Sequence, residues 1–245
     1  MKERSEGPSG PSSASFACAG GRPGAGRPIT IAHRAANDRD ALERALSAGV
    51  DSVEADLRWD GTRIVARHTR RLPLLPLFCD RWYLRFDRRP QLTLDEILER
   101  TRGRARPYLD LKSQSRPFLP ALLEALRRHK VVGEVDISSE YWSQLAELRR
   151  AEPGLRLFRT VGAERQRAAY LALPPDDALQ AGVAIHRDLL DEELAHLLRG
   201  REVTVYVWGV EDVEQATTVL RRGAGGVIAD SVQLLRALKS GSANG

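Results

Sequence analysis

The sequence predicts an α/β protein folded as a single (β/α)8 TIM barrel, in which parallel strands alternate with helices around a closed sheet. Short apolar runs of strand-like composition recur from residue 29 onward, and segments with apolar residues at helical spacing lie between them. A length of 245 residues and a hydrophobic content of 42% suit one barrel with a large core. The alternative is a doubly wound open sheet, which has the same alternation and differs in its strand count.

The expected strands and helices follow one another in order along the chain. The strands cover residues 29–33, 52–57, 107–112, 134–139, 155–160, 182–186, 203–208 and 226–230. The helices cover residues 38–48, 93–102, 117–129, 141–150, 164–173, 190–199, 213–222 and 232–238. In the first of these helices, for example, Leu42, Ala45 and Leu46 share one face. Helix C-caps are expected at Gly49, Gly103, Gly200 and Gly223.

One insertion interrupts this order, after the second strand. Asp60-Gly61 predicts a tight turn, after which the chain returns as an extended run that ends at His68. Residues 69–91 are rich in proline, arginine and aromatic residues, and they predict a long loop that serves as a packed lid or a wall of the substrate site. The insertion after the second strand is therefore small, and no second domain is expected.

Both ends of the chain read as tails, and the composition excludes several classes of protein. Residues 1–28 are expected to be disordered, residues 29–238 to form the barrel, and residues 239–245 to form a second disordered tail. No apolar run is long enough to span a membrane, and the two cysteines form no disulfide framework, so we expect a cytoplasmic protein. The net charge of +5 is spread over interspersed acidic and basic residues, which argues against nucleic-acid binding. The oligomeric state stays open.

Charged residues stand at the ends of the first three strands of the expected barrel. They are His33 and Arg34, Glu54 and Asp56, and Asp110 and Lys112. Because residues two apart in a strand share a face, and because the carboxyl ends of barrel strands meet on one rim, we expect these side chains to gather there. His68 would reach the same rim on the segment after the second strand.

The residue types at this rim indicate metal-assisted phosphodiester chemistry. Three carboxylates without a sulfur ligand suit a hard divalent cation such as Mg²⁺ or Ca²⁺. Two histidines can divide the acid and base roles near neutral pH. Lys112 and Arg34 would balance the charge of a phosphate group, so the sequence predicts cleavage of a small phosphodiester.

The chain resembles the glycerophosphodiester phosphodiesterase family. The matching stretches begin with Ala32-His-Arg, residues 41–56, Val65-Ala-Arg-His and Leu92-Thr-Leu-Asp-Glu-Ile-Leu, and they continue with Leu109-Asp-Leu-Lys, Val207-Trp-Gly-Val and residues 223–230. Together they run from about Ile29 to Leu235. The ordered set at this spacing, rather than any one stretch, carries the resemblance.

The resemblance implies a metal-dependent barrel enzyme of lipid metabolism that releases glycerol 3-phosphate and an alcohol from a glycerophosphodiester. By that likeness His33 and His68 form the acid–base pair, and Trp208 lines the alcohol pocket. It also implies that Glu54, Asp56 and Asp110 hold the metal while Arg34 and Lys112 hold phosphate. From the two histidines we expect that one deprotonates the substrate's glycerol 2-hydroxyl while the other protonates the leaving alkoxide. This gives a cyclic phosphate, which water then opens if the enzyme is a hydrolase rather than a cyclising lyase.

Departures from the family pattern keep other functions open. Ala35 replaces the usual glycine, Ala36-Asn37 stands in place of a Pro-Glu-Asn stretch, Thr69 replaces an aspartate, and Asp110 replaces a glutamate. Asp110-x-Lys112 and the small insertion also resemble the sphingomyelinase D-type phospholipases D. The alternatives are therefore phospholipase D-like cleavage of lysolipids or sphingolipids through a cyclic phosphate, and a barrel that binds phosphate compounds without turnover.

The same residues also have purely structural interpretations. Glu54 and Asp56 could form ion pairs with Arg34 or Arg58, and Lys112 could pair with Asp110. Trp208 could belong to the core, and a structural role is expected for His186 at the end of the sixth strand. These interpretations lose weight only if the charged residues converge on one rim.

Overall fold

The computed structural model describes residues 27–71, 77–79, 84–86, 91–177, 179 and 181–241. In this part of the chain the main sheet has nine strands in the order β1-β12-β11-β10-β9-β8-β7-β2-β3, and β1 also pairs with β2. That additional pairing closes the sheet. Only β3 among these strands runs antiparallel to its neighbour, so the other eight form the closed parallel barrel that the sequence predicts.

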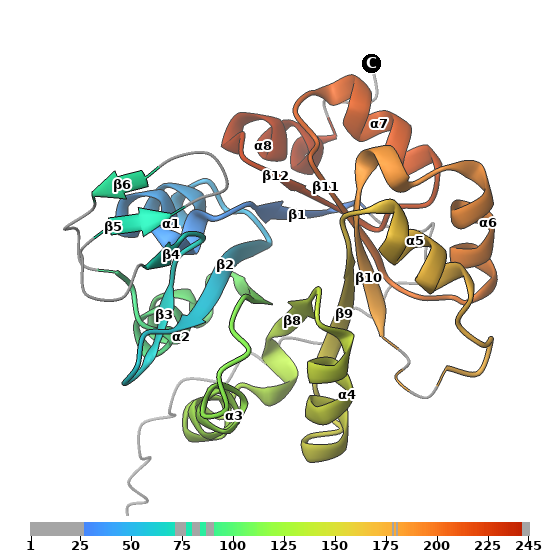
Figure 1. Cartoon of the computed structure of the whole chain (residues 1–245). Helices are drawn as coiled ribbons and strands as arrows, with labels where there is room; N and C mark the ends of the chain where they lie inside the picture. The colour runs from blue at the N-terminus through green and yellow to red at the C-terminus, as the bar shows by residue number, and fades with distance from the viewer. Residues whose placement is uncertain are drawn as a thin grey trace, which may run out of the picture.

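The elements lie close to their predicted positions (Figure 1). The barrel strands are β1 (Ile29–Ala32), β2 (Ser52–Trp59), β7 (Arg106–Leu111), β8 (Asp136–Ser139), β9 (Arg156–Val161), β10 (Gly182–His186), β11 (Val205–Trp208) and β12 (Gly226–Ala229). The helices are α1 (Arg39–Ser47), α2 (Leu94–Thr101), α3 (Phe118–His129), α4 (Trp142–Ala151), α5 (Glu164–Leu171), α6 (Glu192–Gly200), α7 (Val213–Arg221) and α8 (Val232–Ser240). Single 3₁₀ turns are η1 (Ala35–Asn37), η2 (Val132–Glu134) and η3 (Arg187–Leu189).

Small differences from the prediction have local causes. β8 starts two residues later than expected because η2 occupies the preceding residues. Gly200 is the last residue of α6 rather than a cap beyond it, and the left-handed backbone conformation falls on Glu202 (φ 51°). No helix in the described ranges combines the length and apolarity that a membrane span requires.

The barrel interior is filled by side chains that alternate along the strands. The inner cluster consists of Ile31, Tyr108, Phe158, Ala184, Tyr206 and Ile228, with Trp208 packed against it. Two glycines make room for the aromatic rings. A Cβ at Gly182 would lie 2.6 Å from a ring carbon of Phe158, and one at Gly226 would lie 2.8 Å from a ring carbon of Tyr206. Because inward positions recur every second residue, the residues two places beyond this cluster reach the carboxyl-terminal rim.

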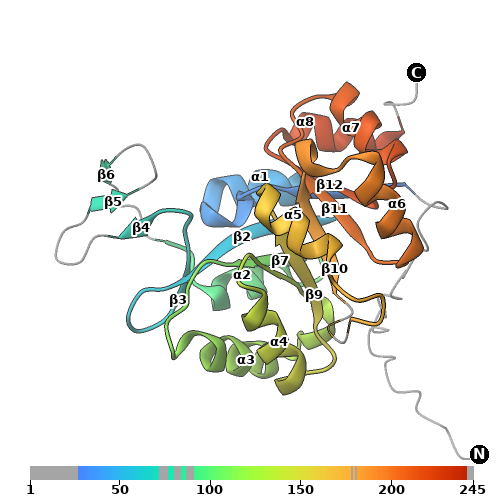
Figure 2. The same ribbon diagram turned by 45° about the vertical axis from the view of Figure 1, so that its right-hand side comes forward.

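The insertion after β2 contains more secondary structure than the predicted loop. β3 (Ile64–Ala66) returns antiparallel to β2 after the turn at Gly61 (φ 114°), as the sequence predicts. A separate antiparallel sheet of β4 (Arg70–Arg71), β5 (Leu77–Cys79) and β6 (Leu84–Phe86) follows and lies beyond β3 in Figures 1 and 2. The interpretation of residues 69–91 as a lid or substrate wall depends on side chains outside the described part of the chain. The disorder predicted for residues 1–28 and 239–245 concerns segments of which residues 1–26 and 242–245 also lie outside the described part of the chain.

Asp51 ties the amino-terminal end of β2 to both ends of the described chain. Its carboxylate accepts hydrogen bonds from Arg27 (2.7 Å) and from the backbone nitrogen (3.0 Å) and hydroxyl (2.7 Å) of Thr30. Lys239 in the last turn of α8 lies 3.0 Å away. Arg27 and Lys239 lie at the borders of the two predicted tails, and these contacts join both residues to Asp51. α8 continues to Ser240, and Gly241, in the left-handed conformation (φ 73°), caps it.

Replacing Asp51 with asparagine is expected to lower the free energy of unfolding by about 2 kcal/mol near neutral pH. Burial opposes ionisation of Asp51, but the bonds from Arg27 and Thr30 outweigh it and hold its pKa below the ordinary value. Such a carboxylate stabilises the fold above its unfolded-state pKa, near about 4, and the contribution is lost as the pH falls. Urea unfolding should give a constant difference between the two proteins from about pH 7 to 5 and a shrinking one below about pH 4. If the difference in the free energy of unfolding between the two proteins stayed the same below about pH 4, the stabilising role of the Asp51 carboxylate would be wrong.

Candidate active site

Three carboxylates meet at the carboxyl-terminal rim of the barrel. Glu54 and Asp56 lie on β2 and Asp110 lies on the neighbouring β7, where Asp56 and Asp110 are partners in the parallel register. Each offers an oxygen atom, and the three oxygens lie within 4.8 Å of one another. Glu54 is only 3% exposed and Asp56 only 2%. The predicted convergence of these residues is therefore found in the structure.

Lys112 contacts this carboxylate cluster directly. Its Nζ lies 2.5 Å from Asp110 Oδ2 and 3.7 Å from Asp56 Oδ1, so the pairing expected from its structural interpretation is present. Burial opposes the charge of Lys112, but the carboxylates of Asp110 and Asp56 outweigh it and raise its pKa, which keeps the ammonium charged. Arg34 Nε adds a longer contact of 3.7 Å to Asp56 Oδ2.

The positive charges of Lys112 and Arg34 do not fully balance the negative charges of the three carboxylates. Burial raises the pKa of Glu54, and the charges of Asp56 and Asp110 raise it further. Burial also raises the pKa of Asp110, against the opposing effect of Lys112. Asp110 Oδ1 is buried and has no hydrogen-bond partner among the residues that the structure describes. An unpaired buried oxygen beside two other carboxylates is the donor set of a hard divalent cation, and these three residues can hold one.

The turn after β1 holds both carboxylates of β2. Arg34 adopts a left-handed conformation (φ 52°), and its backbone nitrogen donates to Glu54 Oε2 at 2.6 Å. Asn37 at the end of η1 donates from Nδ2 to Asp56 Oδ2 at 2.7 Å and accepts from the Asp56 backbone nitrogen at 2.9 Å. Sequence reasoning treated Ala36-Asn37 only as a departure from a pattern. The available signal was an asparagine immediately before the helix cap Asp38.

His33 is held by a carboxylate from the last strand. Closure of the barrel places β1 beside β12, and the His33 backbone nitrogen donates to Ala229 O at 3.0 Å. The next residue, Asp230, lies 2.8 Å from His33 Nδ1 through Oδ1. This hydrogen bond lowers the pKa of Asp230. A carboxylate on one ring nitrogen fixes the orientation of the imidazole, and the sequence analysis did not assign that role to Asp230.

His68 reaches the same side of the barrel through its backbone. Arg58 donates from Nε (3.2 Å) and from a terminal nitrogen (2.9 Å) to the His68 carbonyl, and from its other terminal nitrogen to the Lys112 carbonyl at 2.7 Å. The Arg67 backbone nitrogen donates to Asp56 O at 2.8 Å. Arg58, considered above as a partner of the carboxylates, thus links the segment of His68 to that of Lys112.

Trp208 lies across the barrel from the carboxylate cluster. Its ring meets the ring of His186 edge to face, with centroids 4.5 Å apart, at the ends of the neighbouring strands β10 and β11. A Cβ at Gly162 would lie 3.0 Å from Trp208, so the indole packs against bare backbone. Trp208 also contacts the inner core cluster, in keeping with its structural interpretation. His186 reaches the rim, where its Nδ1 accepts from the Asp188 backbone nitrogen at 3.3 Å.

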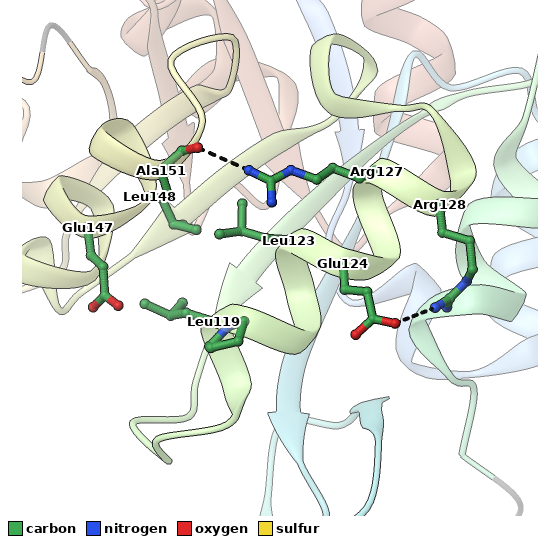
Figure 3. A pocket seen from close by; sticks show the side chains of 9 residues that line it. Leu119, Leu123, Glu124, Arg127, Arg128, Glu147, Leu148 and Ala151 are labelled. Carbon is green, nitrogen blue, oxygen red and sulfur yellow. Dashed lines mark hydrogen bonds and ion pairs between the residues drawn. The ribbon is translucent and has the colours of Figure 1, made fainter.

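A groove of about 670 Å³ lies elsewhere, between α3 and α4 on the outside of the barrel (Figure 3). Leucines from both helices face each other across it, and Arg127 closes one end by donating to Ala151 O at 3.1 Å. Arg128 and Glu124 form an ion pair at 3.6 Å along its border. Glu147 lies apart from these groups, and the charged side chains do not converge on a common point, so the rim remains the candidate for chemistry (Figure 3).

A scan of the sequence against models of known protein families found no match, and a search of the curated proteins found none either. Solved structures do match. A glycerophosphodiester phosphodiesterase from Parabacteroides distasonis gives a TM-score of 0.68 at 20% identity, over 89% of this chain and 100% of that one. A glycerophosphodiester phosphodiesterase from Agrobacterium tumefaciens gives 0.66 at 18% identity, over 86% and 99%.

A phosphodiesterase from Oleispira antarctica, solved in complex with the product sn-glycerol-3-phosphate, gives a TM-score of 0.68. It is 18% identical to this chain, and the match covers 87% of this chain and 97% of that one. At these levels of identity, the likeness establishes that the protein has the barrel fold that the glycerophosphodiester phosphodiesterases share.

Proposed function

We propose that the protein is a metal-dependent phosphodiesterase that hydrolyses glycerophosphodiesters to glycerol 3-phosphate and an alcohol. The observation that carries this proposal is the carboxylate cluster of Glu54, Asp56 and Asp110 on the rim that also carries His33 and Lys112. In a TIM barrel this rim is where active sites are built. The fold likeness to phosphodiesterases, one of them solved with sn-glycerol-3-phosphate, supports the same substrate class.

The residues of the rim have three roles in this proposal: binding of the cation, binding of the phosphate group and contact with the alcohol. Glu54, Asp56 and Asp110 would hold Mg²⁺ or Ca²⁺, which supplies Lewis-acid polarisation of the phosphoryl oxygens when bound. Lys112 and Arg34 place positive charge beside the carboxylates, where they balance a bound phosphate. The Arg34 side chain is 44% exposed, so it can turn toward a ligand at modest cost. Trp208 offers an apolar wall to the alcohol on the opposite side of the rim.

His33 and His68 would transfer the protons. One imidazole takes the proton from the glycerol 2-hydroxyl, and the resulting oxygen attacks phosphorus while the bond to the leaving alcohol breaks. The other imidazole donates a proton to the leaving alkoxide. Water then opens the cyclic phosphate to glycerol 3-phosphate, with the two histidines exchanging roles. Asp230 orients the His33 ring for this step through its contact with Nδ1.

Phosphorus NMR of a glycerophosphodiester pool tests the proposal directly. We expect diester signals to be replaced by glycerol 3-phosphate with Mg²⁺ or Ca²⁺ present, and EDTA to stop the reaction until the cation is restored. Cleavage that continues unchanged in EDTA would remove the metal from the mechanism. Binding of the diesters without cleavage under every cation tested would instead identify a phosphate-binding barrel. A parallel assay with micellar lysolipids distinguishes a phospholipase D-like activity.

A further inference from the structure

We infer that Asn37 is a positioning residue of the cation site: it fixes the Asp56 carboxylate before a cation arrives, and thereby sets the affinity for that cation. This inference rests on the proposed function and deepens it. Asn37 itself is not among the groups expected to touch the cation or the substrate. It acts through Asp56.

The contact between the two residues is made at two points. Asn37 Nδ2 donates to Asp56 Oδ2 at 2.7 Å, and Asn37 Oδ1 accepts from the Asp56 backbone nitrogen at 2.9 Å. One amide group therefore holds both the main chain and the side chain of Asp56. Because Asp56 is only 2% exposed, water has little access to replace this bond, and the charged groups of Arg34 and Lys112 lie farther from its oxygens, at 3.7 Å each. A hydrogen bond to a charged, buried acceptor is among the stronger ones in proteins.

Asn37 is itself held rigidly. Its backbone nitrogen donates to Arg34 O at 3.0 Å, which closes the 3₁₀ turn η1. The next residue, Asp38, caps α1 by accepting from the backbone nitrogens of Asp40 and Ala41. Ala35 and Ala36 in the turn are buried. The amide is thus fixed between a closed turn and a helix start, so its direction does not depend on a bound ligand.

The hydrogen bond from Asn37 to Asp56 engages one carboxylate oxygen of Asp56 and leaves the other for the cation. Oδ2 is taken by Asn37, while Oδ1 faces Lys112 Nζ at 3.7 Å. Arg34 similarly occupies Glu54 Oε2 through its backbone nitrogen at 2.6 Å. The turn after β1 therefore engages one oxygen of each β2 carboxylate. In the absence of a cation the three carboxylates repel one another, and Asn37 opposes rotation of Asp56 away from the cluster.

The test is the substitution Asn37→Ala, with Gln144→Ala as the matched control. Gln144 is also a buried amide with two hydrogen bonds, donating to Ser113 O at 2.8 Å and accepting from the Ser139 hydroxyl at 3.1 Å. Neither of its partners is a carboxylate. Metal-free protein is titrated with Mg²⁺ or Ca²⁺ by calorimetry, thermal unfolding is followed in EDTA, and turnover is measured at saturating cation. A crystal structure of each metal-free variant reports the direction of the Asp56 side chain.

We expect Asn37→Ala to weaken cation binding by about 10- to 100-fold, to turn Asp56 from its position, and to keep kcat near normal at saturating cation. Gln144→Ala should lower thermal stability without changing the cation affinity. Unchanged cation affinity in Asn37→Ala, or a kcat that stays low at saturating cation, overturns the inference. If Asn37→Ala does not fold, Asn37→Ser, which cannot make both bonds, must show the same direction of change. Wild-type protein that binds neither cation overturns the proposed function instead.

Discussion

Replacing His33 with alanine is expected to slow diester hydrolysis by about 100- to 10,000-fold, the usual contribution of a general acid or base. The physical reason is that His33 lies at the end of β1 on the same rim as the carboxylate cluster, with its imidazole oriented by Asp230, 2.8 Å from Nδ1. His68→Ala should have an effect of similar size. Turnover of a glycerophosphodiester at saturating cation is the measurement, because it separates proton transfer from cation binding.

The matched control for these variants is His129→Ala. His129 lies at the end of α3, outside the barrel, where its Nε2 is 2.6 Å from Asp95 Oδ1. It shares the His33 pattern of an imidazole bonded to a carboxylate but is remote from the rim, so near-normal turnover is expected. Asp230→Asn keeps the His33 ring and removes its charged partner, and it should cost less than His33→Ala. If both His33→Ala and His68→Ala turned over normally, the acid–base assignment would be wrong.

The fold could be predicted because the alternation of strand and helix persists over nearly the whole chain. Strands such as β11 and β12 are short, buried apolar runs, and most helices, such as α2 and α7, have one apolar face. The order and spacing of these segments, together with the turn residues between them, locate the elements that show the pattern less clearly. The sheet of β4, β5 and β6 was missed for the opposite reason. Its strands have two or three residues, which is too few to show a period, and proline and arginine surround them.

The site could be predicted in part, by the types of its residues. Charges at strand ends are visible in the sequence, and the closed sheet brings Glu54, Asp56 and Asp110 together as expected. Contacts between residues far apart in the chain were not visible. Asp230 reaches His33 across 197 positions only because the last strand pairs with the first. Asn37 reaches Asp56 because the 3₁₀ turn η1, which follows β1, folds back over β2.

Substituting Glu54 with glutamine is expected to abolish cation binding and, at the same time, to stabilise the metal-free protein by about 1–2 kcal/mol, as functional sites often trade stability for activity. Glu54 is 3% exposed and shares the cluster with two further carboxylates and one lysine. Burial and the neighbouring charges raise its pKa. A carboxyl whose folded-state pKa lies above its unfolded-state value destabilises the fold once it ionises, so a neutral side chain relieves that cost near neutral pH.

Glutamine is the appropriate substitute because its side-chain oxygen can still accept the hydrogen bond that the Arg34 backbone nitrogen makes to Glu54 Oε2 at 2.6 Å. Urea unfolding in EDTA measures the stability, and calorimetric titration with Mg²⁺ or Ca²⁺ measures the binding. Glu99→Gln removes a charge from an exposed glutamate within α2, on the outside of the barrel, and should change neither quantity. A gain in stability together with a loss of cation affinity, seen in Glu54→Gln and not in the control, would show that the carboxylate cluster serves cation binding at the expense of stability. A loss of stability together with unchanged affinity would show that Glu54 serves the fold.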